Sequence, residues 1–300
     1  MAPISTLIQQ LQQGDKKALA RCITIVENEL EGSQEILTSL QFNKSTPVIG
    51  ITGPPGAGKS TLINAVIKEL TGQGKSVGII AIDPTSPFNY GSLLGDRLRM
   101  AEHFNNENVF IRSIATRGSL GGLSAAIIEI VDVMRASDFD YIIVETVGVG
   151  QSEVEIVGLA DTTVLVLVPE SGDDVQSLKS GIMEIADIFV VNKSDREGAA
   201  LFMKNIIQLV HSKPAGNWSI PVLKAVATKN EGVSELITAI NNHHTIGVNT
   251  KRSYLLAEKA YHLIQNHRMK DISKKELQSK LEAALKKDGF NLYRFVQLFK

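Results

Sequence analysis

The sequence predicts an α/β protein with a mostly parallel, doubly wound sheet, and three observations support this fold class. Short apolar runs alternate with helical patterns between about residues 48 and 242, as strands joined by helices require. Several runs are apolar at consecutive positions, which is typical of strands covered on both faces. The first run leads into a glycine-rich loop and then a helical pattern. The predicted strands are 48–52, 77–82, 109–114, 141–144, 163–168, 188–191 and 222–226.

Helical patterns flank the predicted sheet on both sides. In residues 5–42 apolar residues recur at helical spacing, and Gly14 and Gly32 divide the stretch into short helices. Residues 250–300 show helical spacing again, and lysine and arginine outnumber the acids there. The helices of residues 250–300 therefore present either a charged, solvated surface or an arm for oligomerisation. We therefore divide the chain into an N-terminal helical extension (1–44), a central domain (45–245) and a C-terminal helical arm (246–300).

The loop after the first predicted strand matches the phosphate-binding pattern G-x-x-x-x-G-K-[ST] without gaps. Its glycines let the backbone curl so that successive N–H groups point at a polyphosphate, and the following helix adds the positive end of its dipole. We expect Lys59 to reach the β- and γ-phosphates and the Ser60 hydroxyl to bind Mg²⁺. The alternative, a glycine-rich turn with an incidental lysine, fits the strand–loop–helix context poorly. The residues expected to bind nucleotide here are Gly53, Pro54, Pro55, Gly56, Ala57, Gly58, Lys59, Ser60 and Thr61.

Three acidic residues are candidates for a magnesium site. Glu145 ends the predicted strand 141–144 as a Walker-B carboxylate does, and its extra methylene relative to aspartate suggests contact with Mg²⁺ through water. Asp83 and Asp96 stand beside predicted loops, where turn formation or helix capping is the alternative for both. Mg²⁺ prefers hard oxygen ligands and keeps several waters, so acids in addition to a serine are chemically sensible. We assign Ser60, Asp83, Asp96 and Glu145 to the metal, and Lys59, Glu145 and Asp96 to catalysis.

The residues that follow Glu145 predict slow hydrolysis. We expect the Gly148 N–H to bind the γ-phosphate. Val149 stands where Ras-like GTPases carry the glutamine that orients the attacking water, and Gln151 lies two residues further on. Slow intrinsic hydrolysis that a partner accelerates suits a switch better than a metabolic enzyme. Candidates for cationic help, each with a structural role as the alternative, are Arg97, Arg99 and Arg117.

The tetrapeptide Asn192-Lys193-Ser194-Asp195 follows the predicted strand 188–191 and indicates guanine recognition. The Asp195 carboxylate can accept from the N1–H and the 2-amino group of guanine, whereas adenine has an acceptor at N1 and no 2-amino group. Hydrogen bonds to a charged group contribute roughly 1.5–3 kcal/mol each, so GTP should be preferred over ATP by about two decades or more. We expect Lys193 to lie along the purine and Asn192 to tie the loop to the rest of the site. Val226 and Ala227 should contact the base edge through backbone N–H, because valine stands where serine is common.

Composition narrows the classes of partner and compartment. The formal net charge of −1 argues against general binding to nucleic acid or to a membrane surface. The single cysteine, Cys22, excludes internal disulfides and cysteine-rich metal sites, and suits a reducing compartment. No basic segment leads into an apolar stretch at the start, and no apolar run approaches a membrane span. We therefore expect a soluble, cytoplasmic protein.

Five further segments make the motif set jointly specific. They are 83–87 (DPTSP), 94–100 (LGDRLRM), 110–118 (FIRSIATRG), 145–153 (ETVGVGQSE) and 184–187 (EIAD). With the phosphate and guanine motifs, they resemble the MeaB/ArgK/MMAA family of P-loop GTPases, which are chaperones of adenosylcobalamin-dependent methylmalonyl-CoA mutase. The resemblance runs through nearly the whole chain and is strongest from about residue 48 to residue 195.

The resemblance implies properties beyond those that the residues themselves indicate. It implies a homodimer joined by the carboxyl-terminal helices, and a GTP cycle that gates cofactor loading and protects or reactivates the mutase. Segment 172–179 resembles the mobile loop that signals to the mutase. The chain departs from the family pattern at 88–90 (FNY) and at Ser180, where a second basic residue is common, and these departures bear on the identity of the partner. By position, the family's phosphate and magnesium residues are Lys59, Ser60, Asp83, Asp96 and Glu145, and its guanine reader is Asn192, Lys193 and Asp195.

Two other functions are weighed against the chaperone. A metallochaperone GTPase that delivers nickel or another metal would carry cysteine and histidine clusters, but this chain has one cysteine. Its only paired histidines, His243 and His244, are expected in a surface turn. A kinase that phosphorylates a transport protein is disfavoured by the guanine motif and by the absence of an obvious base to activate an acceptor.

Overall fold

The computed structural model describes most of the chain and divides it into two compact units, residues 1–255 and 256–300. The described residues are 3–42, 44–83, 100–115, 125–146, 156–172, 186–211, 218–246, 257, 260–261, 263–265, 267–269, 271–286 and 290–299.

The first unit is built on a seven-stranded sheet in the order β3-β2-β4-β1-β5-β6-β7, and its neighbouring strands pair in parallel. This confirms the predicted fold class and each predicted strand. The last strand ends two residues earlier than predicted, because Val226 leaves the sheet to form an antiparallel bridge with Glu231. The strands are β1 (Val48–Thr52), β2 (Val77–Asp83), β3 (Val109–Ala115), β4 (Tyr141–Glu145), β5 (Thr162–Leu167), β6 (Ile188–Val191) and β7 (Val222–Lys224).

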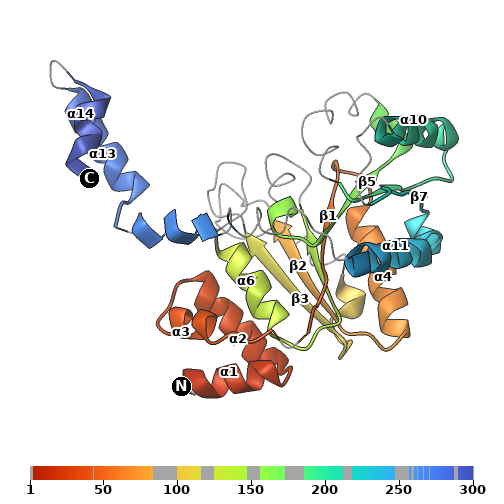
Figure 1. The fold of residues 1–300 in the computed structure, drawn as a ribbon, viewed down its shortest axis with the longest axis horizontal. Helices are drawn as coiled ribbons and strands as arrows, with labels where there is room; N and C mark the ends of the chain where they lie inside the picture. The colour runs from red at the N-terminus through yellow and green to blue at the C-terminus, as the bar shows by residue number, and fades with distance from the viewer. Residues whose placement is uncertain are drawn as a thin grey trace. The chain divides into compact units, whose positions relative to one another are not determined.

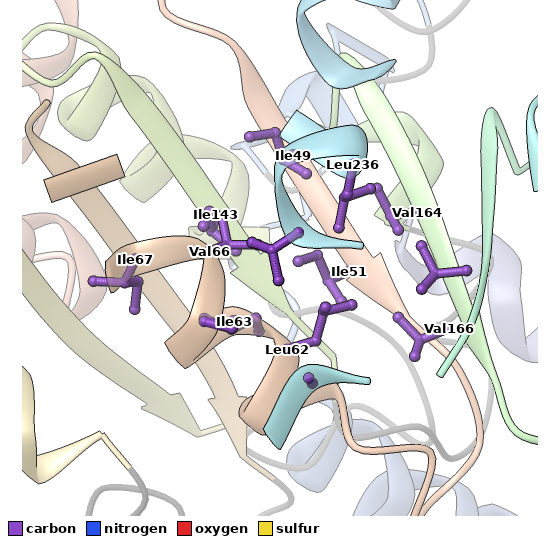
Figure 2. Close-up of a cluster of buried hydrophobic side chains, with 14 of the residues drawn as sticks. Ile49, Ile51, Leu62, Ile63, Val66, Ile67, Ile143, Val164, Val166 and Leu236 are labelled. Carbon is purple, nitrogen blue, oxygen red and sulfur yellow. The ribbon is translucent and has the colours of Figure 1, made fainter. Parts of the chain in front are cut away.

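Helices cover both faces of the sheet, which explains why the strands are apolar at consecutive positions. On one face α4 (Lys59–Gly72) and α11 (Val233–Ile246) pack over the central strands (Figure 1). Figure 2 shows this core, where Val66 of α4 lies near Ile143 of the sheet and Leu62 of α4 lies near Ile51. On the other face lie α6 (Ala125–Arg135) with the N-terminal helices, and α10 (Ala199–His211) over β5 and β6. Short 3₁₀ turns are η1 (Ala101–His103), η2 (Ile156–Gly158), η3 (Pro169–Gly172) and η4 (Ala227–Lys229).

The N-terminal extension forms three short helices that share a hydrophobic core with α6 and the sheet. Their breaks fall at Gly14 and Gly32, as the sequence predicts, and both glycines have positive φ angles (78° and 91°). Polar contacts tie α2 to β3: Arg112 donates to Glu27 at 2.5 Å, and Lys16 Nζ donates to the carbonyl of Val109 at 3.0 Å. The helices are α1 (Ile4–Gln12), α2 (Lys16–Glu27) and α3 (Ser33–Thr38).

The second unit contains α13 (Lys274–Leu285), α14 (Leu292–Val296) and η5 (Gln297–Phe299). The Ser273 hydroxyl accepts from the Glu276 N–H at 3.4 Å and Asn291 accepts from the Arg294 N–H at 3.1 Å, so both helices begin at capping side chains. Phe295 packs between the rings of Phe290 and Phe299, with centroids 6.2 and 5.3 Å away. Among the described residues, no helix is both long enough and apolar enough to span a bilayer.

The paired histidines do not lie in a surface turn, and that expectation was wrong. His243 and His244 belong to the last turns of α11. The His243 side chain is only 17% exposed, its ring lies tilted with its centroid 4.9 Å from that of the Trp218 ring, and it shares a hydrogen bond of 2.8 Å with the Thr162 hydroxyl. The polar run 241–244 resembles a turn in sequence, but the helix continues through it, and Asn241 and His243 are hydrogen-bonded to Tyr141 and Thr162.

Candidate nucleotide-binding site

The phosphate loop joins the carboxyl end of β1 to the start of α4, and two of its glycines are required by their surroundings. Gly53 has φ 144°, and a Cβ atom there would lie 2.1 Å from the carbonyl oxygen of Val166 in β5. Gly58 has φ 84°, and a Cβ atom there would lie 2.5 Å from the Asn192 amide nitrogen. Side chains would therefore push the loop away from both neighbours. The loop ends at the first turn of α4, where unpaired N–H groups and the helix dipole favour an anion.

Lys59 is held against this loop. Its side chain is buried, with 7% of the residue exposed. The ammonium donates to the carbonyl of Gly53 at 2.8 Å and to that of Pro54 at 3.2 Å. A buried ammonium bonded to carbonyl oxygens is ready to exchange these neutral acceptors for the stronger charged oxygens of a phosphate.

Ser60 and Glu145 meet although 85 positions separate them in the chain. The Ser60 hydroxyl donates to Glu145 Oε1 at 2.6 Å, and both residues are 8% exposed. The register of the sheet causes this contact, because Glu145 at the end of β4 pairs with Ile51 of β1, just before the loop. A hydroxyl and a carboxylate at one point are hard oxygen donors of the type that Mg²⁺ prefers, so the residues present fit this ion.

Two threonines that the motif analysis missed support the same corner. The Thr146 hydroxyl donates to the Thr52 hydroxyl at 2.9 Å, and the Thr146 N–H donates to the carbonyl of Ile51 at 3.1 Å. Both threonines are almost completely buried. These bonds fix the end of β4 beside the phosphate loop. The sequence signal is one threonine at the end of β1 and another directly after β4, which becomes informative only once the pairing of these strands is known.

Several predicted site residues lie outside the described residues. Asp83 ends β2, but only its backbone is described. Within the described part of the chain, no group of three or more histidine, cysteine, aspartate or glutamate side chains could hold a metal ion. The assigned metal residues that are described with their side chains are therefore Ser60 and Glu145. The other predicted positions outside the described residues are Asp96, Gly148, Val149, Gln151, Arg97, Arg99, Arg117, Ser180 and segments 88–90 and 173–179.

Asn192 connects the phosphate loop to the two loops that the sequence predicts to read guanine. It is 2% exposed and follows β6. Its amide nitrogen donates to the carbonyl of Ala57 at 2.9 Å, and its amide oxygen accepts from the Ala227 N–H at 3.2 Å. One buried side chain therefore holds three loops together.

The residues after Asn192 are more exposed. Lys193 has φ 53°, an uncommon conformation for a residue with a side chain, and its ammonium donates to the carbonyl of Gly56 at 2.8 Å. Asp195 forms an ion pair with Lys229 at 3.1 Å. The hydrogen bond from Lys229 lowers the pKa of the Asp195 carboxyl below its ordinary value. Arg196 pairs with Glu170 of η3 beside this loop.

The fifth element occupies a closed turn between β7 and α11. The Val226 N–H donates to the carbonyl of Glu231 at 3.0 Å, and the Ala227 N–H is bonded to Asn192. Both N–H groups expected to meet the base edge are thus engaged within the protein. A base contact at this element would have to share one of them.

Comparison with known proteins identifies the family. A family model described as "Methylmalonyl Co-A mutase-associated GTPase MeaB" matches residues 19–285. The chain belongs to the MeaB family. The family resemblance found in the motifs is therefore confirmed, and the chain is a GTPase of this family, for which binding of GTP and GDP follows.

Proteins similar to this chain occur in archaea, bacteria and animals. The chain is 48% identical to a putative GTPase of Pyrococcus abyssi, over 96% of this chain and 89% of that protein. It is 36% identical to the GTPase ArgK of Escherichia coli, over 81% of this chain and 77% of ArgK. It is 35% identical to the methylmalonic aciduria type A homolog of Mus musculus, over 78% of this chain and 61% of that protein. The crystal structure of an LAO/AO transport system kinase matches with a TM-score of 0.69 and 25% identity, covering 98% of this chain and 95% of that one.

Proposed function

We propose that this MeaB-family GTPase is a chaperone that gates cofactor loading and protects or reactivates an adenosylcobalamin-dependent acyl-CoA mutase, and that the mutase is methylmalonyl-CoA mutase. The observation that carries the proposal is the junction at Asn192, which links a phosphate loop to a guanine-reading loop in a chain of this family. The similarity to the methylmalonic aciduria type A homolog supports the choice of mutase.

The arrangement of the loops supports GTP as the nucleotide. Lys59 and the start of α4 would hold the β- and γ-phosphates, while Asp195 would accept from the guanine edge. Ser60 and Glu145, with Asp83 and Asp96, would hold Mg²⁺, which neutralises charge on the phosphates when bound. Val226 and Ala227 would close the base pocket, and Gly148 would donate to the γ-phosphate.

Hydrolysis by this chain alone should be slow. Val149 offers no polar group to orient a water, so the partner must reposition a residue or provide one. A slow hydrolysis rate sets the time for which the GTP-bound state persists. We therefore propose that GTP hydrolysis limits how long the protein acts on the mutase, rather than serving a metabolic conversion of GTP.

The test uses the purified full chain with GTP, Mg²⁺ and increasing amounts of the methylmalonyl-CoA mutase of the same organism. GTP turnover should rise with mutase concentration and level off at a fixed stoichiometry. Unchanged turnover with every adenosylcobalamin-dependent mutase of that organism would contradict the chaperone function. Phosphorylation of a protein from labelled ATP would instead support a kinase, and tight nickel binding would support a metallochaperone.

We also propose that the protein is a cytoplasmic homodimer joined by its C-terminal arm, 246–300. Exposed apolar side chains in the second unit support this, among them Tyr293 (82% exposed) and Leu298 (78%). Sedimentation of the full chain should give a dimer, and Tyr293→Asp with Leu298→Asp should shift it toward monomer. A monomeric wild type at micromolar concentration would contradict the arrangement.

A further inference from the structure

Lys229 is a cationic residue at the base-reading end of the site, and the motif pattern does not include it. Its ammonium lies 3.1 Å from Asp195 Oδ2, the carboxylate expected to read guanine. The Lys229 side chain is 56% exposed and that of Asp195 is 43% exposed. The ion pair therefore leaves the carboxylate open to an approaching base.

The backbone beneath Lys229 is fixed relative to Asp195. The turn that carries Lys229 is closed by the Val226–Glu231 bridge, and the Lys229 N–H donates to the carbonyl of Val226 at 2.8 Å. On the other side, the Ser194 N–H donates to the carbonyl of Ala225 at 3.0 Å. The loop with the aspartate and the turn with the lysine are thus joined through their main chains, so the ion pair does not depend on two independent flexible segments.

Recognition of guanine demands more order from a carboxylate than recognition of a base with one donor. Guanine presents N1–H and a 2-amino group side by side, so both carboxylate oxygens must lie close to the plane of the base. Hypoxanthine lacks the 2-amino group and needs only one oxygen. Each carboxylate oxygen has two acceptor positions, so Oδ2 can accept from a lysine and from a base at the same time.

We infer that Lys229 is a specificity-determining positioning residue, which holds the Asp195 carboxylate in the orientation that accepts both donors of guanine. This role rests on the proposed binding of GTP, and Lys229 is the group that increases the selectivity of the site for guanine. Val226 has no hydroxyl that could donate to the Asp195 carboxylate, and the Lys229 ammonium donates to it instead.

The test compares the binding of GDP and of inosine diphosphate (IDP) to Lys229→Ala by isothermal titration calorimetry. GDP binding should weaken about three- to fivefold, the upper range for loss of an exposed ion pair. IDP binding should stay within about twofold, because one oxygen suffices for it. Lys229→Arg should keep most of the GDP affinity. Lys204→Ala, an exposed lysine of α10, is the matched control and should change neither.

Three results would overturn the inference. Equal weakening of GDP and IDP would mean that Lys229 only attracts phosphate charge. Tighter GDP binding would mean that Lys229 blocks Asp195, and an unchanged ratio with unchanged affinity would make the ion pair idle. Failure of the wild type to bind GDP is a separate result, because it would overturn the proposed nucleotide function itself. Thermal unfolding of each variant shows that the fold is retained.

Discussion

The two halves of the nucleotide site are held in different ways. On the phosphate side, Lys59, Ser60 and Glu145 are each less than a tenth exposed and are bonded to the loop or to one another. On the base side, Asp195 and Lys229 are about half exposed and bonded mainly to each other. Removing the partner of a buried polar group lowers the stability of the protein strongly, because the group is left without a hydrogen bond. An exposed polar group binds water in place of the lost partner, so the cost is small. Changes on the phosphate side should therefore affect folding and binding together, and changes on the base side should affect only recognition.

The largest effect is expected from Lys59→Ala. The ammonium would make at least two charge-assisted hydrogen bonds to phosphate oxygens, each contributing about 1.5–3 kcal/mol, so GTP affinity should fall at least about a hundredfold. Titration with a fluorescent GTP analogue measures this. Lys68→Ala, an exposed lysine of the same helix, should bind as the wild type does. Retention of affinity within tenfold in Lys59→Ala would show that this ammonium does not meet the phosphates.

The next effect is a change of base rather than a loss of binding. In Asp195→Asn the amide offers a donor to the 2-oxo group of xanthine, so preference should move from GTP toward xanthosine triphosphate. GTP affinity should fall about ten- to a hundredfold, the equivalent of one lost charge-assisted hydrogen bond. The melting temperature should change little, because the carboxylate forms only an exposed ion pair with Lys229. The isosteric change Glu197→Gln, two residues along the same loop, serves as control, and unchanged GTP affinity in Asp195→Asn would show that the base lies elsewhere.

Asn192→Ala tests the junction between the two halves and should combine both kinds of effect. The variant leaves the buried carbonyl of Ala57 and N–H of Ala227 without their partner, at a cost of about 1–3 kcal/mol for each unsatisfied group. Urea unfolding should show a loss of stability of about 2 kcal/mol or more, and GTP affinity should fall as well. Asn205→Ala, exposed on α10, should leave both unchanged. Normal stability with weakened binding would assign Asn192 to the base side alone.

The sequence predicted the sheet well because local composition decides it. Strands buried on both faces are mostly apolar, so the fully buried runs, such as 48–52 and 188–191, could be recognised from their own residues. The prediction that the paired histidines lie in a surface turn failed because local composition does not decide the structure there. The run that contains His243 is polar, and the contacts of His243 with the distant residues Thr162 and Trp218 cannot be read from the local sequence.

The chemistry of the site was predictable only where a motif places it on a single loop. The roles of Lys59 and Asn192 could be predicted because each stands in a short pattern with fixed geometry, and these roles stay predictions. The contact between Ser60 and Glu145 depends on the pairing of β1 with β4, and the contact between Thr52 and Thr146 depends on the same register. Lys229 was not predictable, because its distance from Asp195 is set by a turn that closes through the Val226–Glu231 bridge.

The smallest expected effect is on the pH dependence of stability, where the buried His243 and the exposed Asp195 should behave differently. Burial lowers the pKa of His243, where Asp187 and Asp161 oppose the shift and His244 reinforces it. Near pH 6.5, the ordinary histidine value, the unfolded chain then binds more protons than the native state does. The stability from this residue is present above about pH 6.5 and is lost as the pH falls below it. The pKa of the exposed Asp195 is also lowered, but an aspartate contributes stability that is lost only in acid below about pH 4.

Urea unfolding between pH 8 and pH 5.5 should therefore show stability decreasing toward acid in the wild type and in Asp195→Asn. The decrease should be smaller in His243→Gln, where burial of His103, whose pKa is also lowered, still contributes. Parallel pH profiles for wild type and His243→Gln would show that His243 is protonated as readily in the native protein as in the unfolded chain.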